Sequence, residues 1–331
     1  MNLKNYLKLL SNSRFQQIIT IFFFILFFVI GLNIYKDYGL SNDEPFQRSV
    51  GYFWYIHLLE NFSNNVEIIN EIKQKFQSMY WSNYLNEGNL NQYGILFDTL
   101  AAILEELFNI NENREAFFLK HFLTFLFFFI SSIFFYKIIS ERYNNNFFSI
   151  AFTFIYISSP RIFAESFYNC KDIVFMSFCV YSIYFALKNF KSLTYKNLFL
   201  FSLFTAFATN IRIMGIILFL LFFIFLLLDC LENKNLFRKN IFRILFLLFS
   251  FPIFVYLFWP FLWSAPIDNF LFTIKSSANF KSFPGQGILY LGSYYDASNL
   301  PWHYIPVWIL ITTPMILILF FLSGLIITST F

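Results

Sequence analysis

Two adjacent carboxylates, Asp43 and Glu44, follow the first long apolar run and stand directly before Pro45. Proline suits the first turn of a helix and an Asp can cap that helix, so one interpretation is a helix start with a solvated acidic pair. The other interpretation is catalytic. Two adjacent carboxylates cannot both serve one cap, so one can take a proton from an acceptor hydroxyl while the other orients the acceptor or binds a cation. Both interpretations stay open at this point.

Three basic residues, Arg161, Lys171 and Arg212, stand between apolar runs. Arg161 and Lys171 can flank helices and reach the lipid headgroups, or they can neutralise a phosphate. Arg212 follows Asn210 and stands between the apolar runs 197–210 and 213–229, which leave almost no loop between them. A lone Arg in such an apolar stretch is costly unless it meets water, an acid or a phosphate. The sequence therefore predicts phosphate-binding cations at these positions, with snorkelling side chains as the alternative.

Other candidate groups carry weaker signals. Lys120 and His121 lie inside an apolar run, where pairing with a neighbouring acid is expected. Trp302 and His303 close the last polar loop, where aromatic residues form an interfacial belt or stack on a sugar. The chain has no P-loop, GxGxxG, HExxH or GxSxG motif. Its three cysteines show no CxxC spacing, and no metal site is predicted.

The composition defines the elements that must position these groups. The 331 residues are 58% hydrophobic and 13% charged, whereas soluble domains have about 45–50% apolar and about 25% charged residues. This argues against a soluble enzyme and excludes a disordered chain or a coiled coil. The net charge of +4 is mild and no basic stripe with interleaved aromatics occurs, so no nucleic-acid partner is predicted.

Long apolar runs predict an all-α polytopic membrane protein with about eight transmembrane helices in a single domain, 1–331. The runs cover residues 18–34, 116–136, 147–159, 173–187, 197–210, 213–229, 242–259 and 304–327. With a cytoplasmic N-terminus, the short cytoplasmic loops hold a clear excess of Lys and Arg over acids. We therefore predict a multi-pass protein with its site on the outer face of the membrane.

Two long outer loops, 36–115 and 260–303, have enough chain to build a site. Helical spacing predicts amphipathic interface helices over 46–58 and 69–79. The segment 94–109 carries an acidic stripe, and each ionised acid at the bilayer centre would cost roughly 2.5–3.5 kcal/mol. We predict that it is a helix on the outer face rather than a ninth span.

Together, these features resemble the GT-C superfamily of membrane glycosyltransferases, and most closely family 39, with the protein O-mannosyltransferases and the bacterial lipid A aminoarabinose transferases. The resemblance covers nearly the whole chain, through short motifs. These are Asp43-Glu44 after the first span, Gln92-Tyr93-Gly94, the segment from Pro160-Arg161 to Lys171-Asp172, Asn210-Ile211-Arg212, and Leu300-Pro301-Trp302-His303-Tyr304.

The resemblance implies an inverting transfer of sugar from a polyprenyl-phosphate donor to a lipid, glycan or protein acceptor at the non-cytoplasmic face of a bacterial inner membrane or a plasma membrane. It implies Asp43 as general base with Glu44 assisting, and Arg161, Lys171 and Arg212 at the departing lipid phosphate. Further implied substrate contacts are Tyr93, Asp172, Asn210, Trp302 and His303. No cofactor is predicted, and a divalent cation is left open.

Many members of the family are longer, so a minimal or C-terminally truncated member is expected. Two other functions compete with transfer. A lipid-linked sugar transporter or flippase would carry internal repeats and charged, broken spans, and the sequence shows no clear repeat. The second alternative is a non-catalytic membrane assembly partner, which only a measurement of activity can distinguish from an enzyme.

Overall fold

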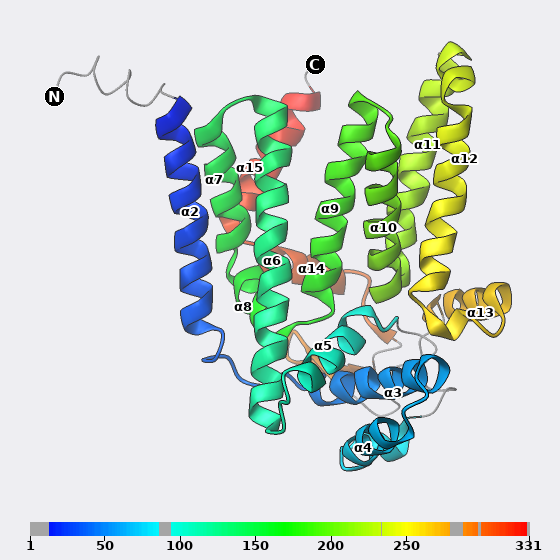
Figure 1. The fold of residues 1–331 in the computed structure, drawn as a ribbon. Coiled ribbons are helices and arrows are strands. Elements are labelled where there is room, and N and C mark those ends of the chain that lie inside the picture. The colour runs from blue at the N-terminus through cyan, green and yellow to red at the C-terminus, as the bar shows by residue number, and fades with distance from the viewer. Residues whose placement is uncertain (1–12, 86–93, 233, 279–286, 297–298, 330–331) are drawn as a thin grey trace.

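A computed structural model describes residues 13–85, 94–232, 234–278, 287–296 and 299–329. Long helices stand side by side as a bundle, and shorter helices lie across one end of it (Figure 1). The bundle helices are α2 (Ser13–Ile34), α6 (Asn113–Tyr143), α7 (Asn146–Ser158), α9 (Asp172–Lys191), α10 (Tyr195–Ile211), α11 (Ile216–Glu232) and α12 (Lys234–Leu257). We call the end covered by the short helices the site end, and the opposite end the basic end.

The site end is built mainly from the two long loops. It holds α3 (Glu44–Phe62), α4 (Val66–Gln77), α5 (Leu96–Leu107), α8 (Pro160–Tyr168) and α13 (Pro266–Ala278). Single 3₁₀ turns lie at Ser82–Tyr84, Ile213–Gly215 and Pro260–Leu262. The predicted outer helix over 94–109 is therefore present as α5, which is too short to cross a bilayer.

Five described helices are long and apolar enough to cross a membrane, or up to seven spans if each of two bent helix pairs crosses as one. The sequence predicts about eight spans. The difference lies partly at α10, which has 17 residues, whereas a span needs about 20. α10 nevertheless packs along both α9 and α12 within the bundle.

Prolines account for the two bent pairs. α7 and α8 meet at 64°, and Pro160 starts α8 in a segment for which the sequence predicted a connecting loop. The predicted single span over 304–327 is broken into α14 (Tyr304–Thr312) and α15 (Met315–Ser329), which meet at 113°. The break is at Thr313, whose extended backbone is what a residue before proline favours.

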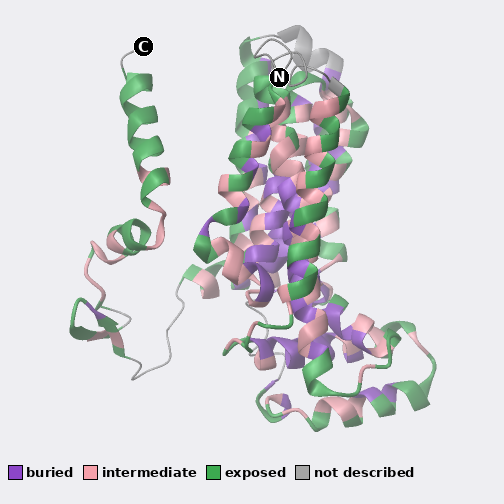
Figure 2. Cartoon of the chain, turned by 90° about the vertical axis from the view of Figure 1, so that its left-hand side faces the viewer, coloured by how far each residue is buried: buried purple, intermediate pink, exposed green. Residues whose placement is uncertain are grey.

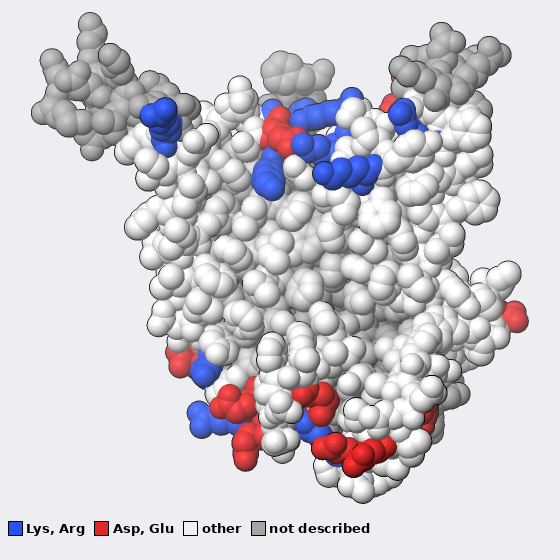
Figure 3. Space-filling view, in the orientation of Figure 1, with Lys and Arg blue, Asp and Glu red and all other residues white. Residues whose placement is uncertain are grey.

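The charges separate by end. On the face shown in Figure 3, Lys and Arg outnumber the acids at the basic end, where Glu141 pairs with Lys188 and Lys191, while acids and bases mix at the site end and an uncharged band lies between the two ends. Together with the long apolar helices, this band identifies a multi-pass membrane protein. The direction in which the chain crosses the membrane stays a prediction from the positive-inside rule.

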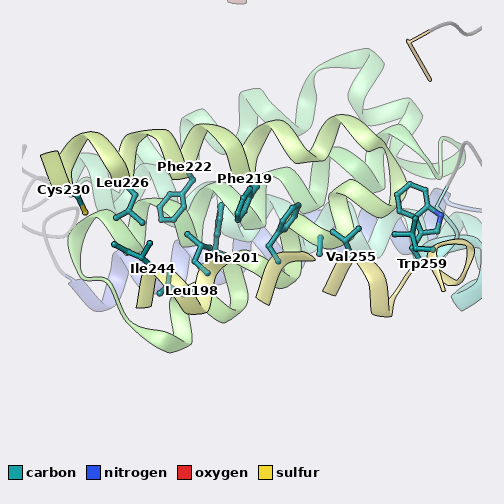
Figure 4. Packing of buried hydrophobic residues seen from close by; sticks show 13 residues of the cluster. Leu198, Phe201, Phe219, Phe222, Leu226, Cys230, Ile244, Val255 and Trp259 are labelled. Carbon is teal, nitrogen blue, oxygen red and sulfur yellow. The ribbon is translucent and has the colours of Figure 1, made fainter. Parts of the chain in front are cut away.

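Aromatic side chains make much of the core. One cluster fills the space between α10, α11 and α12 and runs from Cys230 near the basic end to Trp259 near the site end (Figure 4). Within it the rings of Phe219 and Phe251 stack at 4.2 Å. Many apolar side chains on the outside of the bundle are exposed, as expected where lipid is the solvent (Figure 2).

The C-terminal segment lies apart from the bundle in the view of Figure 2. It begins with a hairpin of β1 (Gly287–Tyr290) and β2 (Ser293–Asp296), the one described departure from the all-α prediction. Leu291 and Gly292 both have positive φ in its two-residue turn. No residue of α14 or α15 is buried.

The predicted interface helices 46–58 and 69–79 are confirmed as helices α3 and α4. However, α3 is buried on several sides rather than along one stripe. It packs closely on α5, because a Cβ added at Gly51 would lie 2.2 Å from the backbone oxygen of Asp98. Protein thus covers part of α3 that the sequence assigned to the membrane surface.

Candidate functional site

The carboxylate pair at the start of α3 is split between solvent and core. Asp43 is exposed at the N-cap position, and its side chain makes no capping bond. Within the part of the chain that the structure describes, no cation pairs with it. Glu44 is 0% exposed, and its Oε2 accepts a 2.7 Å hydrogen bond from the Ser41 N–H. The two neighbours therefore have different environments, one open to a substrate and one held by protein.

Glu44 is held by His121 of α6. Glu44 Oε1 lies 3.0 Å from His121 Nε2, although the angle is not that of a hydrogen bond. His121 Nδ1 lies 3.2 Å from the backbone oxygen of Tyr35, which can only accept, so Nδ1 carries a hydrogen. Glu44 Oε1 and His121 Nε2 thus form a close contact between a buried carboxyl group and a buried imidazole ring, and neither atom has a hydrogen-bond partner in the described residues.

The acidic stripe of α5 is neutralised by cations from three other helices. Lys120 of α6 lies 3.2 Å from Asp98, and both side chains are almost fully buried. Arg48 of α3 donates through Nε to Glu105 at 3.0 Å. Lys75 of α4 pairs with both Glu106, at 2.6 Å, and Glu105, at 3.2 Å. The expected pairing of Lys120 and His121 with neighbouring acids is thus confirmed.

Tyr52 of α3 adds to the same charged layer by donating its hydroxyl proton to Glu106. Burial raises the pKa of Tyr52, and the nearby carboxylates of Glu105 and Glu106 raise it further. The phenol therefore stays neutral and acts as a donor. This layer fixes α3, α4 and α5 to one another below the carboxylate pair.

The predicted phosphate-binding cations have protein partners. Arg161 Nε donates to Glu165 at 2.8 Å, and Arg212 donates to Asp172 at 2.6 Å. Lys171 is half-buried, and burial lowers the pKa of its ammonium group. A phosphate bound by Arg161 or Arg212 would have to compete with, or displace, a carboxylate.

Asn210 has a positioning role in the structure. Its Oδ1 accepts from the N–H groups of Ile95 and Leu96 at 3.0 Å each, and its Nδ2 donates to the backbone oxygen of Phe258 at 2.5 Å. Asn210 is fully buried, so it lies behind the surface that a substrate would contact. It attaches the beginning of α5 to the end of α12.

The other predicted contacts are not assembled beside Asp43. Tyr93 lies outside the described residues. Trp302 is exposed, and His303 Nδ1 lies 2.7 Å from the Tyr290 hydroxyl within the C-terminal segment that stands apart from the bundle. Asp172, by contrast, lies at the site end, where it pairs with Arg212.

Cys170 connects α3 to the start of α9. Its thiol contacts the side-chain oxygen of Gln47, one turn into α3. Burial raises the pKa of the Cys170 thiol to about 12, so it is a protonated donor at neutral pH. Cys170 and Cys230 lie at opposite ends of the molecule and are free thiols.

Two hollows lie near the start of α3, and neither Asp43 nor Glu44 is among the residues that line them. One, of about 380 Å³, is lined by Pro45, Arg48, Ser49, Lys75, Ser78, Met79, Tyr80, Trp81, Asn111, Asn113 and Phe117. The other, of about 280 Å³, is lined by Lys36, Tyr38, Leu40, Arg114, Phe117, Phe118 and His121. We call them the amide hollow and the cationic hollow. Phe117 lines both, and the segment carrying Asp43 and Glu44 runs between Leu40 and Pro45.

Most residues that line these hollows were not predicted from the sequence. Lys36 and Arg114 flank apolar runs, a place where basic residues usually only snorkel. Tyr80 and Trp81 follow α4 in a polar stretch that shows no motif. A weak signal was present in their aromatic and amide composition, but only the fold brings these residues together.

Among the described residues, no group of three or more His, Cys, Asp or Glu side chains could hold a metal ion. No family model, no curated protein and no solved structure matches this chain. The resemblance to the GT-C superfamily therefore stays a prediction from the sequence motifs and their order.

Proposed function

We propose that this chain is an inverting glycosyltransferase that moves a sugar from a polyprenyl-phosphate donor to an acceptor at the non-cytoplasmic membrane face. The observation that supports this most directly is the position of Asp43. It is an exposed carboxylate without a protein partner in the described chain, at the site end, in the segment between Leu40 of the cationic hollow and Pro45 of the amide hollow.

In the proposed reaction, the acceptor hydroxyl oxygen attacks the anomeric carbon of the sugar. Asp43 takes the hydroxyl proton as the new carbon–oxygen bond forms. The bond from the anomeric carbon to the phosphate oxygen breaks, and its electron pair leaves with the lipid phosphate. A single displacement of this kind inverts the anomeric centre. Cations near the phosphate stabilise the negative charge that grows on it.

The environment of Glu44 suits an assisting role. Because Glu44 is buried against His121, it fixes the backbone on which Asp43 stands and does not contact bulk solvent. The amide hollow suits the sugar or the acceptor, since Tyr80 and Trp81 offer rings while Asn111 and Asn113 offer neutral donors and acceptors. We retain Arg161, Lys171 and Arg212 as proposed phosphate contacts.

The test is transfer by the purified chain, reconstituted in lipid, with a panel of radiolabelled polyprenyl-phosphate sugars. Asp43→Asn keeps the shape of the side chain but cannot take the proton, so we expect turnover to fall about 10²–10⁴-fold. Glu44→Gln should be less harmful than Asp43→Asn. The matched control is Glu67→Gln, which neutralises an exposed acid in the first turn of α4.

Each outcome separates the functions considered. If Asp43→Asn keeps turnover and Glu44→Gln is inactive, the two roles are exchanged. If both variants keep turnover, the pair serves only the start of α3. Movement of a lipid-linked sugar across the vesicle without chemical transfer would indicate a flippase, and absence of transfer and movement with every donor would favour an assembly partner.

A further inference from the structure

The cationic hollow brings two like charges onto one aromatic ring. Lys36 Nζ lies 5.4 Å from the centre of the Phe118 ring, and the Arg114 guanidinium carbon lies 5.2 Å from the same centre. Lys36 follows the end of α2, and Arg114 stands in the first turn of α6. Both cations line the cationic hollow, where their like charges favour the binding of an anion.

No described carboxylate fills that role. Asp37 beside Lys36, and Glu112 and Glu115 beside Arg114, form no ion pair with either cation in the described residues. This distinguishes the cationic hollow from Arg161 and Arg212, each of which pairs with an acid. The first turn of α6 adds unsatisfied backbone N–H groups and the positive end of a helix dipole.

The position of the hollow indicates that the anion belongs to a lipid. It opens where the apolar part of α2 ends, and Val29, Ile30 and Leu32 expose their side chains on the stretch leading to it. A hydrocarbon tail packed against this apolar part of α2 would place its headgroup near Lys36 and Arg114. Tyr38, Phe117 and Phe118 provide an aromatic wall at the level expected for headgroups.

The geometry points to a binding site for the phosphate of a membrane lipid in the cationic hollow, with Lys36 and Arg114 as its ligands. Arg114 offers a planar fork to two phosphate oxygens, and Lys36 adds a point charge. The binding of a lipid phosphate in this hollow does not depend on the proposed function, in which Arg161, Lys171 and Arg212 contact the donor phosphate. His121 lines the same hollow and also contacts Glu44, so a phosphate bound in the hollow would lie near the contact between His121 and Glu44.

The experiment is a binding titration of the purified full chain in detergent micelles with dioctanoyl phosphatidic acid, followed by thermophoresis. Dioctanoylglycerol, which lacks the phosphate, and inorganic phosphate, which lacks the tails, are titrated alongside. Lys36→Gln/Arg114→Gln should weaken phosphatidic acid binding by at least roughly tenfold, because charge-assisted hydrogen bonds are lost. Lys36→Gln alone should give a smaller loss, and Lys36→Arg should restore most of the affinity.

The matched control is Lys137→Gln/Arg243→Gln at the basic end. Lys137 Nζ lies 5.4 Å from the Phe134 ring centre, and the Arg243 guanidinium carbon lies 5.6 Å from that of Tyr195. Like Lys36→Gln/Arg114→Gln, this control variant loses two positive charges and their cation–π contacts. It should nevertheless bind phosphatidic acid like the wild type. Lys36 is exposed, so its single variants report on the site even if the double variant fails to fold.

Equal affinity of the wild type and both Lys36→Gln variants for phosphatidic acid would overturn the site, as would equal binding of dioctanoylglycerol. Inorganic phosphate that competes as strongly as phosphatidic acid would replace the lipid with a soluble anion. Binding that depends on Lys36 and Arg114 without any sugar transfer would refute only the proposed function. Transfer without such dependence would refute only this site.

Discussion

Glu44 and His121 meet in the buried layer between the first loop and the bundle, with 3.0 Å between Oε1 and Nε2. Glu44 is the first residue of α3, and His121 lies two turns inside α6. The contact therefore fixes the start of the loop helix, and with it the exposed Asp43, to the longest helix of the bundle. The contact thus restrains Asp43, the candidate base, although Asp43 itself lies in a loop.

Removing His121 should destabilise the fold, because the buried Glu44 carboxyl group would lose its contact with α6 and keep only the Ser41 N–H as a partner. We expect His121→Ala to cost about 1–3 kcal/mol, the usual range for leaving a buried polar group incompletely paired. Adding Glu44→Gln to His121→Ala replaces the carboxyl group with a neutral amide, which costs less to bury, and should restore part of that loss. Thermal unfolding in detergent measures both effects. Equal unfolding temperatures for the wild type and His121→Ala would show that the contact contributes nothing.

Asn210 offers a test of how α5 is held. Asn210→Leu leaves the N–H groups of Ile95 and Leu96 and the Phe258 oxygen without their partner, at about 1–3 kcal/mol for each buried group. Asn210→Asp keeps the acceptor for both N–H groups, and its protonated form, which full burial favours, also keeps a donor for the Phe258 oxygen, at the cost of holding the buried acid neutral. Thermal unfolding should rank the stabilities as wild type, then Asn210→Asp, then Asn210→Leu. Thr209→Val, at a buried neighbour that bonds only within its own helix, is the control.

Cys170 predicts a loss of stability at high pH. Its pKa is raised from 9.0 to about 12 in the fold, so the unfolded thiol ionises first while the folded thiol keeps its proton. The stabilisation is present below pH 9 and is lost as pH rises toward 12. Cys170→Ser keeps a donor for Gln47 but does not titrate.

At pH 10.5, the wild type should therefore have lost about 2 kcal/mol more than Cys170→Ser, relative to pH 8. Unfolding temperatures of the two proteins at both pH values measure the difference. Parallel pH profiles would contradict the assignment of this titration to Cys170.

The orientation can be tested with an impermeant thiol reagent on intact cells. The positive-inside rule places Asn64, between α3 and α4, outside and Ser192, between α9 and α10, in the cytoplasm. Asn64→Cys should be labelled in intact cells, and Ser192→Cys only after the membrane is opened. Both positions are exposed in the fold, so burial does not interfere. The reverse pattern would invert the topology and move the site end to the cytoplasm.

The sequence predicted the helical membrane class, α3, α4 and α5 because these depend on apolar length and periodicity, which are local properties. The prediction that α5 is a separate helix and not a span agrees with its length of 12 residues, whereas the pairing of its acids with Arg48, Lys75 and Lys120 was not predicted in full. The breaks at Pro160 and Pro314 were harder to predict, since proline is also tolerated inside spans, as Pro252 in α12 shows.

The candidate site was predicted only in part. Asp43 and Glu44 were predicted as a pair, but their opposite burial depends on His121, which is 77 positions away and carried no catalytic motif. Lys36 and Arg114 looked like ordinary residues at helix ends. Their common contact with Phe118 arises from the packing of α2 against α6, which no local pattern encodes.

The pairing of α5 has a consequence for biosynthesis. Its acids Asp98, Glu105 and Glu106 emerge from the ribosome after Arg48 and Lys75 but before Lys120, and Asn210 follows 115 positions after Ile95. Until α6 is inserted, Asp98 has no buried partner, and until α10 is inserted, the beginning of α5 has no anchor. The first loop can therefore reach its final place only after five later helices, from α6 to α10, have been made, so the site is one of the last parts of the protein to mature.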